Sequence, residues 1–181
     1  MASITIITGC PGSGKTTLSH RLAQALPKGV HLHADDFYDY IAPKISPILP
    51  AAHQQNTTVM LAIARATSAY ATGDYDVVVD GIFGPWFLPT LAAEFQSLTC
   101  PVNYVVIRLP LEETILRATT RLNNPASEEI IRHMYPLFNH LGEFERYVFH
   151  VDVSASEDIL IELNQRLQAG EFRLNWSLVT R

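Results

Sequence analysis

The feature that most restricts the fold of this chain is a glycine-rich segment near its start. The sequence GCPGSGKT occupies residues 9–16, after the apolar run ITIIT and before a helical pattern that includes Leu18 and Leu22. The pattern G-x-x-x-x-G-K-[ST] between a strand and a helix is typical of a loop whose backbone amides surround phosphate oxygens. A simple connecting turn has no use for a lysine and a threonine at those offsets. The segment therefore predicts a strand–loop–helix unit that binds a nucleotide phosphate.

Each part of this loop has an expected role. The glycines allow backbone conformations that a Cβ atom disfavours, so that successive amides turn inward at the positive end of the following helix. Lys15 is expected to bring a positive charge to the β- and γ-phosphates of ATP, and Thr16 to occupy one coordination position of Mg²⁺. We interpret Thr17 mainly as a packing residue. The expected nucleotide-binding residues are Gly9, Cys10, Pro11, Gly12, Ser13, Gly14, Lys15, Thr16 and Thr17.

The remaining sequence alternates between strand and helix signals. Apolar runs predict strands at residues 4–8, 30–34, 76–80, 102–109 and 148–153. Helical spacing predicts helices after the glycine-rich loop, around residues 59–70, and at residues 88–97, 111–121, 127–141 and 156–168. We expect Gly73 to end the second helix in a left-handed conformation, and three prolines predict an irregular loop over residues 41–56. This alternation favours one α/β domain, residues 1–181, with a parallel sheet covered on both faces.

Composition narrows the class of protein. Hydrophobic residues make up 48% of the 181 residues and charged residues 17%, which excludes a disordered chain. The apolar runs are too short to span a bilayer of roughly 30 Å, and the start of the chain shows no secretory or transit pattern. The formal charge is −5, and the basic residues are scattered. We therefore expect a cytoplasmic monomer or homodimer whose partners are a nucleoside triphosphate and a small molecule, with neither nucleic acid nor membrane.

Carboxylates follow two of the predicted strands. Asp35 and Asp36 stand directly after the second strand, and Asp80 ends the third, at the edge of the sheet where ligands bind in open α/β folds. We interpret Asp35 as the base that accepts a proton from an acceptor hydroxyl. Thr16, Asp36 and Asp80 are the expected residues at Mg²⁺, bound directly or through water. A helix N-cap is the alternative role for each of these carboxylates.

Arginines and a small set of other residues complete the predicted site. Arg117 and Arg121 lie four residues apart on one helix face and are expected to stabilise charge on the transferred phosphoryl group, although Arg117 also has an i,i+4 partner in Glu113. His31 and His33 are interpreted as structural or substrate-adjacent. The candidate substrate-contacting residues are Asp35, Phe37, His53, Gly81 and Trp86.

Taken in order, the glycine-rich loop, HADDFY, VVVDG and a later R-x-x-x-R resemble the small P-loop kinases of the nucleoside-monophosphate-kinase fold. Within that group the chain is similar to chloramphenicol phosphotransferase-like, gluconate-kinase-like and zeta-toxin-like proteins. The resemblance implies a three-layer P-loop NTPase fold with a five-stranded parallel sheet in the order 2-3-1-4-5. It also implies ATP with Mg²⁺, an acidic base at Asp35 and a short lid at about residues 111–126.

The acceptor is the least determined part of the prediction. Nucleoside monophosphate kinases commonly carry an arginine after the third strand, whereas this chain reads DGIFGPW, and Lys44 and Arg65 are the only basic residues between 30 and 100. Bidentate arginine contacts favour phosphorylated acceptors, so an uncharged alcohol fits better. We therefore expect transfer of the γ-phosphoryl group to a hydroxyl of a small, uncharged acceptor. Two alternatives are a nucleotide-dependent switch or slow ATPase, and a nucleoside monophosphate kinase.

Overall fold

The structure, a computed structural model, describes residues 2–122, 125–151 and 158–179. Within these residues, five parallel strands form one sheet in the order β2-β3-β1-β4-β5. This confirms the expected strand order and the three-layer α/β class. The strands are β1 (Ile4–Gly9), β2 (Gly29–His33), β3 (Asp76–Gly81), β4 (Val102–Arg108) and β5 (Val148–His150).

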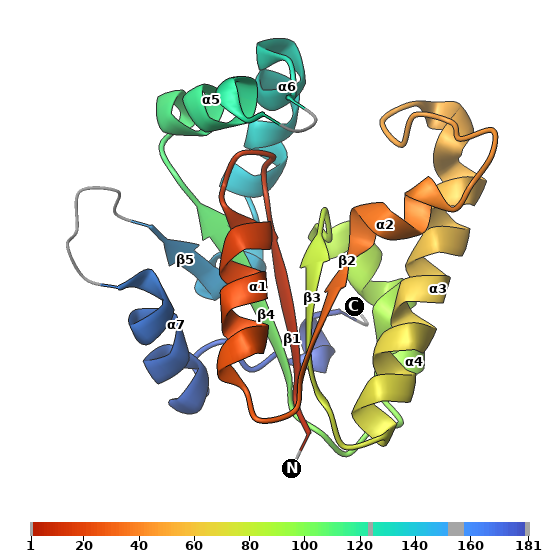
Figure 1. The fold of residues 1–181 in the computed structure, drawn as a ribbon, viewed down its shortest axis with the longest axis vertical. Coiled ribbons are helices and arrows are strands. Elements are labelled where there is room, and N and C mark those ends of the chain that lie inside the picture. Colours follow the sequence, from red (N-terminus) through yellow and green to blue (C-terminus); the bar gives the residue numbers. More distant parts are fainter. Residues whose placement is uncertain (1, 123–124, 152–157, 180–181) are drawn as a thin grey trace.

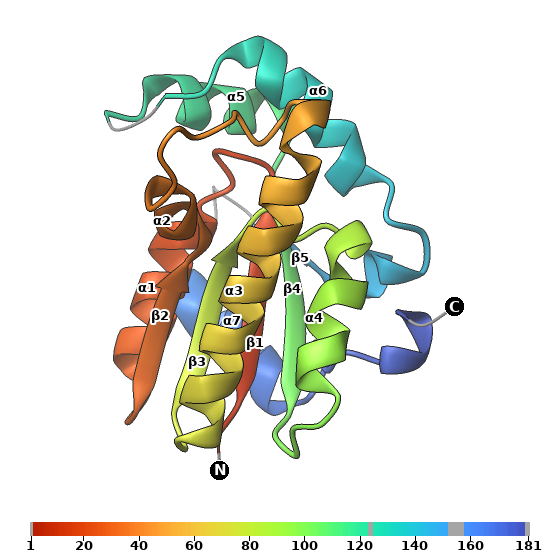
Figure 2. The same cartoon turned by 90° about the vertical axis from the view of Figure 1, so that its right-hand side faces the viewer.

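Helices cover both faces of this sheet. In Figures 1 and 2, α1 and α7 lie on one face, α3 and α4 lie on the other, and α5 and α6 lie beyond the carboxyl ends of the strands. The helices are α1 (Lys15–Ala25), α2 (Ala34–Asp39), α3 (His53–Thr72), α4 (Leu88–Phe95), α5 (Leu111–Thr120), α6 (Glu128–Asn139) and α7 (Ile159–Gln168). Short 3₁₀ helices span Pro50–Ala52, Pro85–Phe87, Gly142–Tyr147 and Trp176–Leu178. None of the helices in the described ranges is long and apolar enough to cross a membrane.

The sheet divides the apolar core into two clusters. Ile6 points into the cluster under α3 and α4, whereas Ile7 points into the cluster under α1 and α7. This alternation follows from the two-residue period of a strand, and the central strands are apolar on both faces because helices cover both. The packing of the sheet positions the carboxyl ends of its strands. The glycine-rich loop follows β1 at this end of the sheet.

Several predicted boundaries need correction. Ala34 begins α2 instead of ending β2. The predicted loop at residues 41–56 becomes helical from Pro50, because a proline suits the first turn of a helix, and α3 begins at His53. Gly73 has a φ of −77°, and Asp74 takes the left-handed conformation with a φ of 63°. The predicted ends at residues 152–153 and 156–157 fall outside the described residues.

Candidate nucleotide and acceptor sites

The phosphate loop joins β1 to α1. Gly12 and Gly14 have φ values of +88° and +85°, the left-handed region that glycine adopts most readily, and the Ser13 amide donates to the Cys10 carbonyl at 3.1 Å. Lys15 is the first residue of α1, and Gly14 is its N-cap. The loop therefore places its amides and the positive end of α1 together, which suits an anion.

A cavity of about 270 Å³ lies over this helix start and brings residues of the loop and α5 together. Burial lowers the pKa of Lys15, while the charges of Asp80 and Asp35 oppose that shift and the charge of Arg121 adds to it. The side chain of Thr17 is exposed, so the packing role expected for it is wrong. The residues around the cavity are Gly12, Gly14, Lys15, Thr16, Thr17, Arg117 and Arg121.

Arg117 makes both of the contacts considered for it, an ion pair and a contact with the phosphate site. Its guanidinium pairs with Glu113 one turn earlier. The same side chain also lines the cavity over the start of α1, which we call the phosphate cavity. Arg121 follows the last residue of α5 and reaches the same cavity. The two arginines thus add positive charge opposite the phosphate loop.

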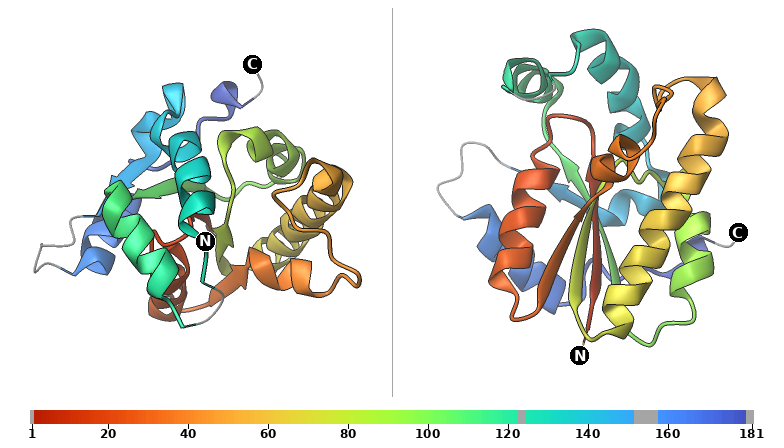
Figure 3. Two further views of the ribbon diagram at one scale, coloured as in Figure 1. Left: turned by 90° about the horizontal axis from the view of Figure 1, so that it is seen from above. Right: turned by 45° about the vertical axis from the view of Figure 1, so that its right-hand side comes forward.

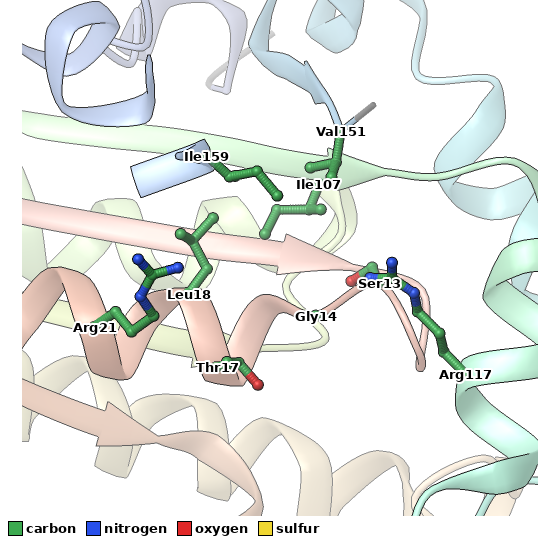
Figure 4. Close-up of a pocket in the computed structure, with 9 residues that line it drawn as sticks. All are labelled: Ser13, Gly14, Thr17, Leu18, Arg21, Ile107, Arg117, Val151 and Ile159. Carbon is green, nitrogen blue, oxygen red and sulfur yellow. The ribbon is translucent and has the colours of Figure 1, made fainter. Parts of the chain in front are cut away.

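A second cavity of about 180 Å³ adjoins the first, sharing with it Gly14, Thr17 and Arg117 (Figure 4). Sequence reasoning missed its walls, since apolar residues on strands and helices carry the same pattern whether they face a core or a ligand. Ser13 also lines it and has a buried hydroxyl with no hydrogen-bond partner among the described residues. The apolar wall residues are Leu18, Ile107, Val151 and Ile159.

A buried carboxylate lies beneath the phosphate loop. Thr16 Oγ1 donates to Asp80 Oδ2 at 2.7 Å, and His31 Nε2 lies 2.6 Å from Asp80 Oδ1. Asp80 is fully buried, and a hydroxyl beside a carboxylate is the oxygen donor set that Mg²⁺ prefers, so these two residues fit the ion. Asp36, the third expected ligand, is exposed and pairs instead with His33 at 3.1 Å. The role of His31 was missed because a histidine on a strand carries no signal of its partner.

The third cavity, of about 410 Å³, contains Asp35 and Trp86 from the predicted acceptor set. His53 does not line it, and its exposed side chain is on the first turn of α3. Phe37 packs against the core, and Gly81 is needed for packing, because a Cβ there would lie 2.5 Å from the Cβ of Ala34. The structure therefore assembles two of the five candidates and separates the other three from the cavity.

Other residues of this cavity were not anticipated. Tyr38 belongs to α2, and burial together with the nearby charge of Asp35 raises its pKa to about 12. Asn56 comes from α3 and His133 from α6. Viewed from above in Figure 3, α2 and the start of α3 lie on the opposite side of the strand ends from α5. The cavity shares no lining residue with the two nucleotide cavities, but it adjoins the phosphate loop, because Pro11 of that loop lines it.

Comparisons with known proteins agree with this arrangement. A family model described as an AAA domain matches residues 5–134. No curated protein sequence matches the chain at a significant level. A sugar kinase from Janibacter sp. HTCC2649 aligns with a TM-score of 0.71 and 17% identity, covering 93% of this chain and 95% of that one.

Two further solved structures are similar. Shikimate kinase from Acinetobacter baumannii in complex with shikimate has a TM-score of 0.62 and 18% identity, with 96% of this chain and 97% of that chain covered. A chain of the Pnkp1/Rnl/Hen1 RNA repair complex has a TM-score of 0.65 and 18% identity, covering 87% of this chain but only 52% of that one. These likenesses confirm the fold of the small P-loop kinases.

Proposed function

The chain belongs to the AAA domain family, and from that premise we propose that it is a kinase that transfers the γ-phosphoryl group of ATP to a hydroxyl of a small, uncharged acceptor. The observation that carries the proposal is the position of Asp35. This carboxylate lines the third cavity and also lies close enough to Lys15 to act on its pKa. Pro11 of the phosphate loop lines the same cavity, which supports a reaction between a nucleotide on the loop and a ligand beside Asp35.

In the proposed reaction, the amides of the phosphate loop and the Lys15 ammonium bind the β- and γ-phosphates. Thr16 and Asp80 would hold Mg²⁺, which would supply positive charge to the phosphates when bound. Asp35 accepts the proton of the acceptor hydroxyl as the hydroxyl oxygen forms a bond to the γ-phosphorus. At the same time the bond between the γ-phosphorus and the β–γ bridging oxygen breaks, and ADP leaves. Arg117 and Arg121 stabilise the charge on the moving phosphoryl group.

The second cavity is assigned to the nucleotide base. Its apolar wall suits the faces of a purine, and it shares three residues with the phosphate cavity, so that one nucleotide reaches both. Two structural neighbours, a sugar kinase and a shikimate kinase, support the phosphorylation of a small molecule.

Phosphoryl transfer to a panel of small alcohols tests the proposal. Asp35→Asn should lower transfer by about 100-fold or more, because the proton would lose its acceptor. Asp39→Asn is the matched control, since Asp39 is an exposed carboxylate of the same helix that pairs with Lys44 and lines none of the three cavities. ATP hydrolysis that no acceptor accelerates would favour the switch or slow ATPase, and preferred transfer to CMP, UMP or AMP would show a nucleoside monophosphate kinase.

A further inference from the structure

We propose that Arg21 selects a purine nucleotide by stacking its guanidinium on the base, and that Asp158 holds the guanidinium in place. This inference rests on the assignment of the second cavity to the nucleotide base under the proposed function. It goes further by naming the side chain that distinguishes one class of base from the other. It does not depend on the identity of the acceptor.

The second cavity has an arginine at each end. Figure 4 shows Arg21 and Arg117 at opposite ends of this cavity, with apolar wall residues between them. Arg117 also lines the phosphate cavity and pairs with Glu113, so its charge lies near the expected position of the triphosphate. Arg21 lines the second cavity and neither of the other two. Its guanidinium is therefore placed to contact the base and not the phosphates.

An ion pair determines the position of Arg21. Its Nη2 donates to both carboxylate oxygens of Asp158, at 2.9 and 2.8 Å. Asp158 is the N-cap of α7 and accepts from the amide of Leu160 at 3.0 Å, so the start of the helix fixes the carboxylate in turn. The pair connects α1 to α7, and these helices supply Leu18 and Ile159 to the wall of the cavity.

This ion pair is better explained by orientation than by stability. The two side chains are 45% and 41% exposed, and an ion pair of that exposure adds little to the free energy of unfolding. Without a partner, an arginine on a helix surface samples many rotamers, and a base that stacked on it would have to order the side chain first. The Asp158 carboxylate removes that cost before the nucleotide binds.

The guanidinium keeps its stacking surface in this arrangement. The hydrogen bonds to Asp158 are made by Nη2 at the edge of the planar group, so they do not use its faces. An aromatic base on such a face gains cation–π attraction and close contact. The two fused rings of a purine cover more of the guanidinium and of the apolar wall than a single pyrimidine ring does. Stacking on Arg21 therefore favours ATP over CTP.

Calorimetry with three ligands in the presence of Mg²⁺ separates the base from the phosphates. ATP has a purine base, CTP has a pyrimidine base, and inorganic tripolyphosphate has no base. We expect the protein to bind ATP at least about threefold more tightly than CTP, because the purine stacks more fully. The measurement needs neither an acceptor nor phosphoryl transfer.

Three variants test whether Arg21 makes this contact. Arg21→Lys keeps the charge but lacks the planar group, so ATP binding should weaken about fivefold, the preference for ATP over CTP should disappear and tripolyphosphate binding should not change. Asp158→Asn can still cap α7 but loses the charge that holds Arg21, and ATP binding should weaken about twofold. Arg65→Lys is the matched control, since Arg65 is an exposed arginine that pairs with Glu94 and lines none of the three cavities. Circular dichroism confirms that each variant is folded.

The outcomes distinguish this inference from the kinase function. An equal loss of affinity for ATP and tripolyphosphate in Arg21→Lys would show that Arg21 acts on the phosphates, and unchanged ATP binding would show that it contacts no part of the nucleotide. Either result overturns the inference and leaves the kinase proposal standing. The expected pattern without transfer to any acceptor would support the inference and remove the kinase proposal. No binding of ATP by the unmodified protein would overturn both.

Discussion

The contact between the phosphate loop and α5 can be tested with two glycine substitutions. A Cβ atom at Gly12 would lie 2.4 Å from the carbonyl oxygen of Thr114 and 2.9 Å from the Cβ of Ala118. A Cβ at Gly14 would have no atom within 4 Å. Both glycines have nearly the same left-handed φ, so Gly14→Ala is a matched control that carries the backbone strain of Gly12→Ala without the clash.

The expected magnitudes follow from this difference. Each alanine costs about 1–2 kcal/mol for the left-handed backbone, and each gains the same small amount from a less flexible unfolded chain. Gly12→Ala must also move the backbone of α5 by roughly 1 Å to reach an ordinary contact distance, which adds about 1–3 kcal/mol of overpacking. Gly12→Ala should therefore have a free energy of unfolding about 1–3 kcal/mol below that of Gly14→Ala, or a Tm lower by roughly 2–12 °C.

Urea denaturation of the protein without nucleotide measures this difference, because a bound phosphate would add its own contacts with either Cβ. Equal losses of stability in the two variants would show that the loop and α5 are not in contact, and would refute the reasoning. If the difference is found, calorimetry should show weaker ATP binding by Gly12→Ala, since the displaced helix carries Arg117.

Three further predictions follow from the buried groups of the nucleotide site. Lys15→Ala should weaken binding of ATP with Mg²⁺ by more than about tenfold in calorimetry, under any of the nucleotide-dependent functions considered, because the phosphates lose a charge partner; unchanged binding heat would contradict the assignment. His31→Ala should raise the Mg²⁺ concentration needed for half-maximal ATP binding by several-fold, because Asp80 loses the imidazole nitrogen 2.6 Å from its Oδ1. His31→Gln should partly restore the Mg²⁺ dependence, and an unchanged Mg²⁺ titration in His31→Ala would exclude a positioning role. Burial raises the pKa of the Cys10 thiol from 9.0 to about 11, so the unfolded chain loses this proton at a lower pH than the folded chain. The free energy of unfolding should therefore fall as the pH rises from 9 to 11, by at most about 2.7 kcal/mol. Cys10→Ala should remove that part of the alkaline loss in denaturation curves, and an identical pH dependence would show that the thiol is not buried.

The sequence predicts the strand, the glycine-rich loop and the helix that follows it, because the signal for this unit is local. Gly12, Gly14 and Lys15 are adjacent in the chain, and the backbone conformation that they require is determined by their own residue types. The proposed acceptor cavity is built from residues far apart in sequence, such as Asp35, Asn56 and His133. Their proximity depends on how α2, α3 and α6 pack, and a single sequence contains no local pattern for that packing.

The same limit applies to individual side chains. Asp80 was predicted from its place at the end of a strand, but its second partner, His31, is on the neighbouring strand. The sheet register places His33 opposite Asp80, and His31 lies two residues earlier on the same face of the sheet. His53 and Phe37 were predicted to contact the substrate, but neither lines the third cavity. His53 begins α3 with an exposed side chain, and Phe37 packs against the core, because helix formation and packing decide where these side chains lie.

Under the proposed function, the separate linings of the nucleotide and acceptor cavities have an evolutionary consequence. Because no residue lines both, substitutions at positions such as Trp86 or Asn56 can change what is recognised without altering a contact to ATP. Selection for a new metabolite then acts on one half of the gene product while the chemistry of the other half is inherited intact. A fold divided in this way diversifies readily, and directed evolution of this chain would begin with the acceptor wall.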